Sequence, residues 1–302
     1  MSDLTAASDP ATDDIVQPFQ IEASSLRGRL IRLGPALDEI LSQHAYPEPV
    51  AMLLGEAIAM AILMASALKY DGVFTLQTKG DGPVPIMVVD VASTGDLRGY
   101  ARFVADRPTD GGAATVPALI GTGLLAFTVD QGEFTERYQG IVELSGDTLA
   151  ECLQHYFRQS EQLDAGIRLA VGRRDGRWRA GALMVQRLPE PGQQPPASDR
   201  EDDWRRAMVL LGSAREDEFL DTGLAANALL YRLYHEDGVR IFAPHSLRAA
   251  CRCSRDRVIG TLSALPRAEV EALKEDGTIE VQCEFCNRAY RFDDAQLADV
   301  FR

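Results

Sequence analysis

Four cysteines near the C-terminal end constrain the fold of this 302-residue chain more than any other feature. They form two close pairs, Cys251-Arg-Cys253 and Cys283-Glu-Phe-Cys286, with 29 residues between the pairs. A tetrahedral zinc ion is bound by four sulfur atoms at about 2.3 Å, and two short cysteine pairs on separate turns can supply them. The spacing therefore predicts that Cys251, Cys253, Cys283 and Cys286 bind one Zn²⁺ per chain.

The same pairs are close enough to oxidise. A disulfide closed across one intervening residue is expected to be strained, and strained disulfides belong to the labile, regulatory class. Arg252, Arg255 and Arg257 lie near the first pair in sequence, and positive neighbours favour the thiolate, which both binds metal and reacts with oxidants. Glu284 opposes this effect at the second pair. The spacing leaves two interpretations open, a redox-regulated site and a permanently closed structural site.

Net charge limits the partners of the chain. Its composition, with 46% hydrophobic and 25% charged residues, is that of a globular protein. The formal charge of -14 argues against a broad phosphate-binding surface, because nucleic-acid affinity depends chiefly on Lys and Arg. Anionic membrane surfaces are disfavoured for the same reason. We therefore expect a protein that binds neither nucleic acid nor membrane.

The location of the protein is predicted from its cysteines and its first residues. Five cysteines cannot all pair, and their clustering is typical of an intracellular metal or redox site rather than of a secreted disulfide framework. Residues 1–18 contain neither Lys nor Arg and no apolar block, so they match no secretory or transit signal. The longest apolar stretch, Ala57–Leu68, is shorter than a bilayer requires and predicts a buried helix. We expect a cytoplasmic protein.

The fold class is predicted to be α+β, with an N-terminal domain of mixed sheet and helix, a helical linker and a small zinc-binding domain. Pro189–Pro196 is a composition break that marks the first boundary. The predicted parts are a disordered acidic leader at 1–18, an α+β core at 19–188, a metastable helical linker at 189–245 and a four-cysteine redox-switch domain at 246–302.

Hydrophobic periodicity and turn residues predict the elements of the core domain. Two helices are expected at Pro35–His44 and Pro47–Leu68, and a further amphipathic helix follows the capping box Thr148–Glu151. Cys152 lies on the apolar face of that helix, where a buried hydrophobe is favoured over a reactive thiol. The expected strands are Phe19–Ile21, Arg29–Leu33, Val73–Lys79, Val84–Val91, Leu97–Phe103, Leu124–Asp130, Glu136–Leu144, Ile167–Val171 and Trp178–Gln186.

The last two parts are predicted to be less stable. Linker helices are expected around Trp204–Leu211 and Leu224–Tyr234, and they combine apolar faces with many charges. Such helices can pack on a neighbouring domain and remain in solution when they are released from it. An ordinary helical connector is equally compatible with this pattern. The terminal domain is short and has few large apolar side chains. Bound zinc contributes about 10–16 kcal/mol in small thiolate sites, so metal loss should unfold this domain. Its expected elements are helices at Arg255–Leu265 and Pro266–Glu275 and a hairpin of Thr278–Gln282 with Ala289–Phe292.

Several segments along nearly the whole chain resemble the heat shock protein 33 family of redox-regulated holdase chaperones. Asp164-Ala165 departs from the family pattern, which usually has Pro-Thr at this point. The matching segments are Lys79–Pro83, Arg98–Ala101, Gly123–Thr128, Tyr156–Gln162, Leu230–His235, Cys251–Arg255 and Cys283–Cys286.

The resemblance implies a chaperone and not an enzyme. It implies a reduced, zinc-loaded form that is inactive, and an oxidised, zinc-free form that binds unfolding client proteins without ATP. It assigns the four cysteines as zinc ligands in the reduced state and pairs Cys251 with Cys253 and Cys283 with Cys286 in the oxidised state. It also implies that the oxidised form is a homodimer joined through the N-terminal domain, acting in the stress response.

Two other classes of protein remain as alternatives. A zinc-ribbon interaction or nucleic-acid module is disfavoured because residues 247–302 carry nine Lys and Arg against ten Asp and Glu. A thiol-disulfide oxidoreductase is disfavoured because its C-x-x-C motif opens a helix in a βαβ unit, whereas Cys283–Cys286 is predicted between hairpin strands. His245 is near the cysteines in sequence but is expected to be solvated or to cap a helix.

Overall fold

The computed structural model describes residues 13–24, 26–104, 115–132, 138–157, 164–187 and 197–300. The chain divides into two compact units, Met1–Ala249 and Ala250–Arg302. Both contain helices and sheet, so the predicted α+β class is confirmed. The Pro-rich break and most of the Tyr156–Gln162 segment lie outside the described residues.

The first sheet of the N-terminal unit has six antiparallel strands, with the order β10-β1-β2-β9-β8 and with β11 beside β1. Strand β1 begins at Ile15, so the predicted disordered leader is wrong for its last residues. The β8–β9 hairpin turns at Asp175 and Gly176, both at positive φ. The strands are β1 (Ile15–Ile21), β2 (Leu26–Leu33), β8 (Ala165–Arg174), β9 (Arg177–Arg187), β10 (Val239–Ile241) and β11 (His245–Ser246).

The second sheet has the order β12-β5-β4-β3-β6-β7. Four of its five strand pairs are antiparallel, and β12 runs parallel to β5. We call the segment 239–249 the strap, because its three short strands pair with both sheets. The strands are β3 (Val73–Gly80), β4 (Ile86–Ala92), β5 (Asp96–Arg102), β6 (Gly123–Asp130), β7 (Tyr138–Glu143) and β12 (Arg248–Ala249).

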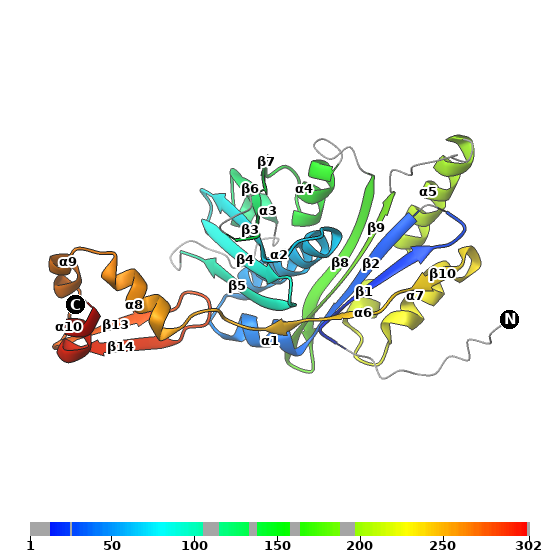
Figure 1. Ribbon diagram of the computed structural model, residues 1–302. Helices are drawn as coiled ribbons and strands as arrows, with labels where there is room; N and C mark the ends of the chain where they lie inside the picture. Colours follow the sequence, from blue (N-terminus) through cyan, green and yellow to red (C-terminus); the bar gives the residue numbers. More distant parts are fainter. Residues whose placement is uncertain are drawn as a thin grey trace. The chain divides into compact units, whose positions relative to one another are not determined.

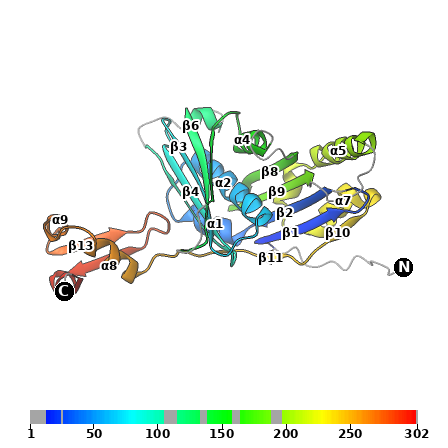
Figure 2. The ribbon, with the colours of Figure 1, turned by 45° about the horizontal axis from the view of Figure 1, so that its top comes forward.

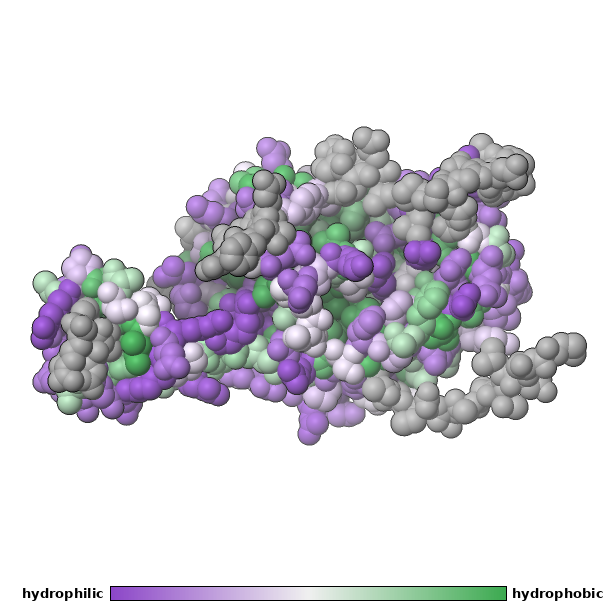
Figure 3. Space-filling view, viewed as in Figure 1, coloured by the Kyte–Doolittle hydropathy of each residue, from purple (hydrophilic) through white to green (hydrophobic). Residues whose placement is uncertain are grey.

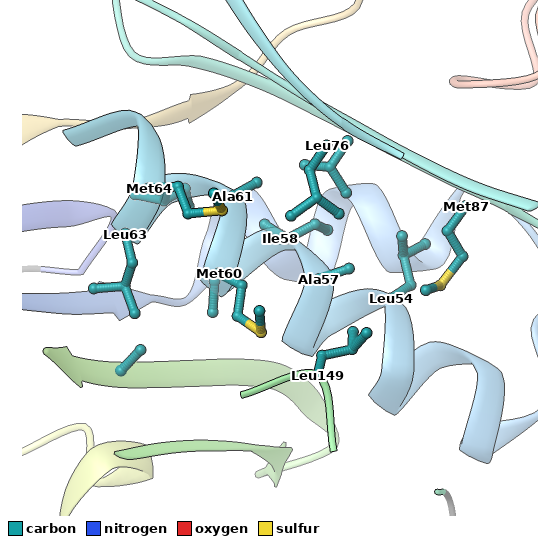
Figure 4. Close-up of a cluster of buried hydrophobic side chains, with 14 of the residues drawn as sticks. Leu54, Ala57, Ile58, Met60, Ala61, Leu63, Met64, Leu76, Met87 and Leu149 are labelled. Atoms are coloured by element: carbon teal, nitrogen blue, oxygen red, sulfur yellow. The ribbon is translucent and has the colours of Figure 1, made fainter. Parts of the chain in front are cut away.

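Helix α2 (Glu48–Ala67) lies between the two sheets (Figures 1 and 2). Ile58 points toward Leu76 on β3, whereas Leu63 points the opposite way, toward the first sheet (Figure 4). The helix predicted at Pro47–Leu68 is confirmed, but by length and composition α2 could cross a membrane, so the inference that its apolar run is too short to do so is corrected. However, 78% of its apolar window is buried inside the unit, which is typical of a core helix. The other helices of this layer are α1 (Pro35–Ser42), α3 (Val116–Leu119) and α4 (Leu149–Tyr156).

Helix α4 begins as its capping box predicted. The Thr148 side chain accepts a hydrogen bond from the Glu151 amide, and the Glu151 carboxylate accepts one from the Thr148 amide. Cys152 on the next turn is 1% exposed within the main core. Burial raises the pKa of this thiol, so Cys152 is an unreactive core residue, as predicted.

Glu56 is the one acidic residue in the middle of α2, and it is largely removed from water. Among the residues that the structure describes, no hydrogen-bond or ion-pair partner contacts its carboxylate. Burial raises the pKa of Glu56 to about 7. The folded state therefore becomes less stable as the pH rises from about 4.5 to about 7, because the unfolded chain ionises this group first.

We expect Glu56→Gln to stabilise the folded protein by about 1–3 kcal/mol at pH 8 and to change stability little at about pH 4.5. Urea unfolding at both pH values measures the difference. Glu48→Gln is the matched control, because Glu48 is exposed on the same helix. An equal effect of both substitutions, or no gain at pH 8, would contradict this account of Glu56.

Three helices cover the outer face of the first sheet, on the side away from α2 (Figure 2). We call α5 (Ala197–Gly212), α6 (Glu216–Leu220) and α7 (Ala226–Tyr234) the linker helices. Together with the sheet they form a second apolar core, separate from the one around α2. Leu229 and Leu230 on α7 are both 0% exposed, and the Tyr234 ring stacks on Phe19 of β1 at 5.8 Å.

The surface of the molecule contrasts with these cores. Hydrophilic residues occupy most of the visible face in Figure 3, with smaller apolar areas between them. The high apolar content of the chain is therefore largely placed inside the two cores of the N-terminal unit.

The C-terminal unit is small. Among its described residues, six form a buried hydrophobic core, with Phe292 and Leu262 among them. The predicted hairpin is present, whereas the helix predicted at Pro266–Glu275 ends at Ala272. Its elements are α8 (Arg255–Ser263), α9 (Arg267–Ala272), β13 (Thr278–Gln282), β14 (Ala289–Asp293) and α10 (Asp294–Val300).

Candidate metal centre

The first cysteine pair precedes helix α8. The hydroxyl of Ser254, the N-cap of α8, accepts a hydrogen bond from the Arg257 amide at 3.2 Å. This cap fixes the direction of the chain directly after Cys253. Cys251 and Cys253 therefore lie on a short segment that ends where α8 begins.

The second pair lies in the turn of the β13–β14 hairpin. The Cys283 amide donates to the Arg288 carbonyl at 2.9 Å, and the Asn287 amide donates to the Cys283 carbonyl at 2.9 Å. Asn287 has a φ of 58°, a left-handed conformation that asparagine tolerates better than most residues. The turn thus brings Cys283 and Cys286 to the same end of the hairpin.

The four sulfur atoms of Cys251, Cys253, Cys283 and Cys286 all lie within 4.8 Å of one another. The Sγ atoms of Cys251 and Cys283 are 3.7 Å apart, and those of Cys253 and Cys286 are 3.4 Å apart. Four sulfurs at about 2.3 Å from a central ion are separated by about 3.8 Å in a regular tetrahedron. The cluster thus has the size and the donor set of a thiolate metal site.

Electrostatics also favour a cation at this cluster. Burial raises the pKa of Cys253, but hydrogen bonds from Tyr290 and the other thiols outweigh it, and the pKa falls to about 7. Burial and the neighbouring cysteines raise the pKa of Cys286 to about 12. One thiolate is stabilised, whereas further thiolates beside it repel each other. A bound cation would remove that repulsion and allow all four to ionise.

Tyr290 is a polar partner of the cluster that the sequence did not reveal. Its hydroxyl lies 3.1 Å from the Cys253 sulfur and donates to it. Tyr290 belongs to β14 and is 37 positions from Cys253 in sequence. Nothing in the spacing of the cysteines points to a tyrosine at this distance, and only the pairing of β13 with β14 places it there.

Two basic residues near the cysteines in sequence, an arginine and a histidine, have other contacts. The Arg255 guanidinium lies 4.2 Å from the Phe292 ring centre and donates to the Arg291 carbonyl at 3.0 Å. It therefore fastens α8 to β14. His245 is exposed in β11, where it pairs with Val16 of the N-terminal unit.

The linker helices are attached to the first sheet by a buried cation as well as by apolar contacts. Arg32 on β2 is 1% exposed, and its Nη1 donates to the Leu224 carbonyl at 2.6 Å. Its Nη2 donates to the Asp221 carbonyl. Both acceptors lie in the loop between α6 and α7, so one side chain of the sheet fixes the position of that loop.

Comparisons with known proteins agree with this arrangement. A family model described as Hsp33 protein matches residues 14–293. A 33 kDa chaperonin of Caulobacter vibrioides is 44% identical over 293 residues, covering 93% of this chain and 95% of the relative. A 33 kDa chaperonin of Pseudomonas fluorescens is 40% identical over 290 residues, covering 95% of this chain and 93% of the relative.

A solved structure also shares the fold. The crystal structure of a 33 kDa chaperonin from Thermotoga maritima superposes with a TM-score of 0.80, covering 95% of this chain and 97% of the other. Sequence identity in that comparison is 22%, so it supports the fold alone. The family model and the curated relatives both span nearly the whole sequence. The chain therefore belongs to the Hsp33 protein family.

Proposed function

We propose that this protein is a redox-regulated, ATP-independent holdase whose chaperone activity is controlled by the cysteine cluster. Family membership makes the chain a chaperone rather than an enzyme. The observation that supports the redox control is the cluster itself, with four sulfurs within 4.8 Å of one another in a unit whose described residues form a core of six buried side chains. A core of that size is marginal for independent folding.

In the reduced state we propose that Cys251, Cys253, Cys283 and Cys286 hold one Zn²⁺. A bound zinc ion would join the segment before α8 to the β13–β14 turn and so add a crosslink to the small apolar core of this unit. Tyr290 would orient the Cys253 sulfur through its hydrogen bond.

Oxidation by a peroxide changes the cluster chemically. Each pair of thiols loses two electrons and two protons to one hydrogen peroxide, giving one disulfide and two water molecules. The resemblance to the family assigns the pairs Cys251 with Cys253 and Cys283 with Cys286. A sulfur that is part of a disulfide no longer offers a thiolate to a metal, so the crosslink between the two segments would be lost.

We propose that loss of that crosslink releases the linker helices, because the strap connects them to the C-terminal unit along the chain. The strap ends at Ala249, directly before the first residue of the C-terminal unit. Unfolding of that unit would leave the strap held only by its short strand pairs with β1 and β5. Release of the strap and the linker helices would uncover the second apolar core, which includes Phe19, Leu30 and Leu183 on the sheet.

The apolar face uncovered in this way is the surface that we propose for unfolding client proteins. We further propose a cytoplasmic location, a homodimer in the oxidised state, and no binding to nucleic acid or membrane. The clustered thiols and the charge of -14 support the first and last of these assignments.

One titration tests the proposal. Peroxide is added to the reduced, zinc-loaded protein with mild warming, while a chromogenic chelator follows zinc release and light scattering follows aggregation of a heat-denatured client. We expect zinc release and suppression of scattering to rise together. Zinc release without suppression would contradict the chaperone control, and equal suppression by the reduced form would contradict the redox switch.

A further inference from the structure

A cavity of about 670 Å³ lies in the N-terminal unit, where residues of both sheets meet. Its wall is formed by β1, β2, the C-terminal end of α2, the turn between β4 and β5, and strap residues Pro244–Leu247. Within the described part of the chain, no cysteine and no residue of the linker helices lines it. The cavity is thus distinct from the thiol cluster and from the apolar face described above. Its volume is within the range of small-molecule sites.

The charge of the cavity differs from that of the whole chain. Arg29 and Lys69 line it, and none of the described residues that line it is acidic. The chain as a whole carries a formal charge of -14. A concave site with one sign of charge concentrates counter-ions of the opposite sign. The cavity is therefore an anion-attracting site in an otherwise acidic molecule.

Arg29 is a partly buried cation without a carboxylate partner among the described residues. Its Nε donates to the Ser66 carbonyl at 2.8 Å, and its Nη1 donates to the side-chain oxygen of Gln186 at 3.2 Å. Both acceptors are neutral, and within the described part of the chain they engage two of the five guanidinium donors. Burial, together with the charge of Arg27, lowers the pKa of Arg29 to about 10.

A partly buried cation without an opposite charge beside it favours the binding of an anion. We propose that the cavity binds a small organic anion whose phosphate or carboxylate head group lies against Arg29 and Lys69. Other residues that line the cavity are apolar, among them Ile62, Leu68 and Leu247. The anion therefore carries an apolar body of modest size in addition to its head group.

Binding of such an anion would also stabilise the strap. The Leu247 amide donates to the Asp14 carbonyl at 2.7 Å, and the Arg248 amide donates to the Gly95 carbonyl at 3.0 Å. These bonds hold the strap where it forms one side of the cavity. A ligand that contacts both the strap and the sheets favours the state in which the two are docked. Stabilisation of the docked strap by the anion requires neither zinc nor oxidation, so it can be tested independently of the proposed redox control.

The test is calorimetric titration of the reduced, full-length protein with two probes, phenyl phosphate and phenylacetate. We expect at least one of them to bind with one site per chain, and the tighter probe identifies the head group. Inorganic phosphate and benzyl alcohol, which have the head group or the ring alone, are expected to bind at least about 10-fold more weakly. Binding of neither probe would overturn the proposal, and equal binding of inorganic phosphate would overturn the apolar part of it.

Variants locate the site. Arg29→Gln is expected to weaken the tighter probe at least about 10-fold, and Lys69→Gln about 3-fold or more. Lys69 is exposed, so its substitution is expected to leave the fold intact. Arg177→Gln is the matched control, because it removes one exposed positive charge outside the cavity. An equal loss of affinity in all three variants would overturn the assignment of the site. Slower hydrogen exchange of the Leu247 and Arg248 amides with the probe bound would support the effect on the strap.

Discussion

Cys283→Ser is expected to lower the apparent zinc affinity of the protein by more than about 100-fold, because residues outside the ligand set already change zinc affinity about 10- to 100-fold when they are replaced. The serine hydroxyl is not a thiolate, and it replaces a sulfur that lies 3.7 Å from that of Cys251. Since six described residues form the buried core of the C-terminal unit, we expect Ala250–Arg302 to unfold while the two sheets and α2 of the N-terminal unit remain folded.

Competition with a chromogenic chelator measures the affinity, and hydrogen exchange resolved by segment measures which unit unfolds. Cys152→Ser is the matched control, since Cys152 is a thiol buried in the other unit. It is expected to leave zinc retention unchanged. A Cys283→Ser protein that retains zinc, or whose C-terminal amides stay protected after zinc loss, would refute the assignment of the cluster as the element that holds this unit folded.

Leu230→Ala is expected to activate the reduced protein without oxidation. Leu230 is 0% exposed between α7 and the first sheet, and removal of a fully buried leucine side chain costs about 2–5 kcal/mol. The substitution weakens the packing of the linker helices on the sheet, so these helices should be released in a larger fraction of molecules. We expect the reduced, zinc-loaded variant to suppress aggregation of a heat-denatured client.

Light scattering of the client measures the activity, and metal analysis checks that one zinc per chain is retained. Tyr231→Ala is the matched control, because Tyr231 is the next residue on the same helix and is 64% exposed. It should leave the reduced protein inactive. If Leu230→Ala releases the linker helices, as seen by faster hydrogen exchange in α7, and yet the client aggregates, then the covered face is not the client-binding surface.

The parts of the fold that the sequence predicts are those with a strong local pattern. The apolar run predicts α2 within one residue of each observed bound, and the capping box at Thr148 predicts where α4 begins. The β8–β9 turn follows from Asp175 and Gly176, which accept positive φ. In each case the deciding interactions join residues close in sequence.

The parts that the sequence does not predict depend on distant residues. Strands β11 and β12 have two residues each, too few for an alternating pattern to be visible, and they form only because β1 and β5 offer free edges. The contact of Tyr290 with Cys253 likewise needs the folded hairpin. For the cysteine cluster, spacing identifies the four residues, whereas the hydrogen bonds around them become visible only in the structure.

The pairing of the strap with β1 and β5 has a consequence for shortened forms of the protein. A chain that ended at Asp237 would leave the outer edges of β1 and β5 without their neighbours β10, β11 and β12. Unpaired strand edges offer rows of amide and carbonyl groups to any other polypeptide and promote self-association. An isolated N-terminal fragment should therefore stay monodisperse only if it extends through Ala249, because the strap residues serve as edge protection for both sheets.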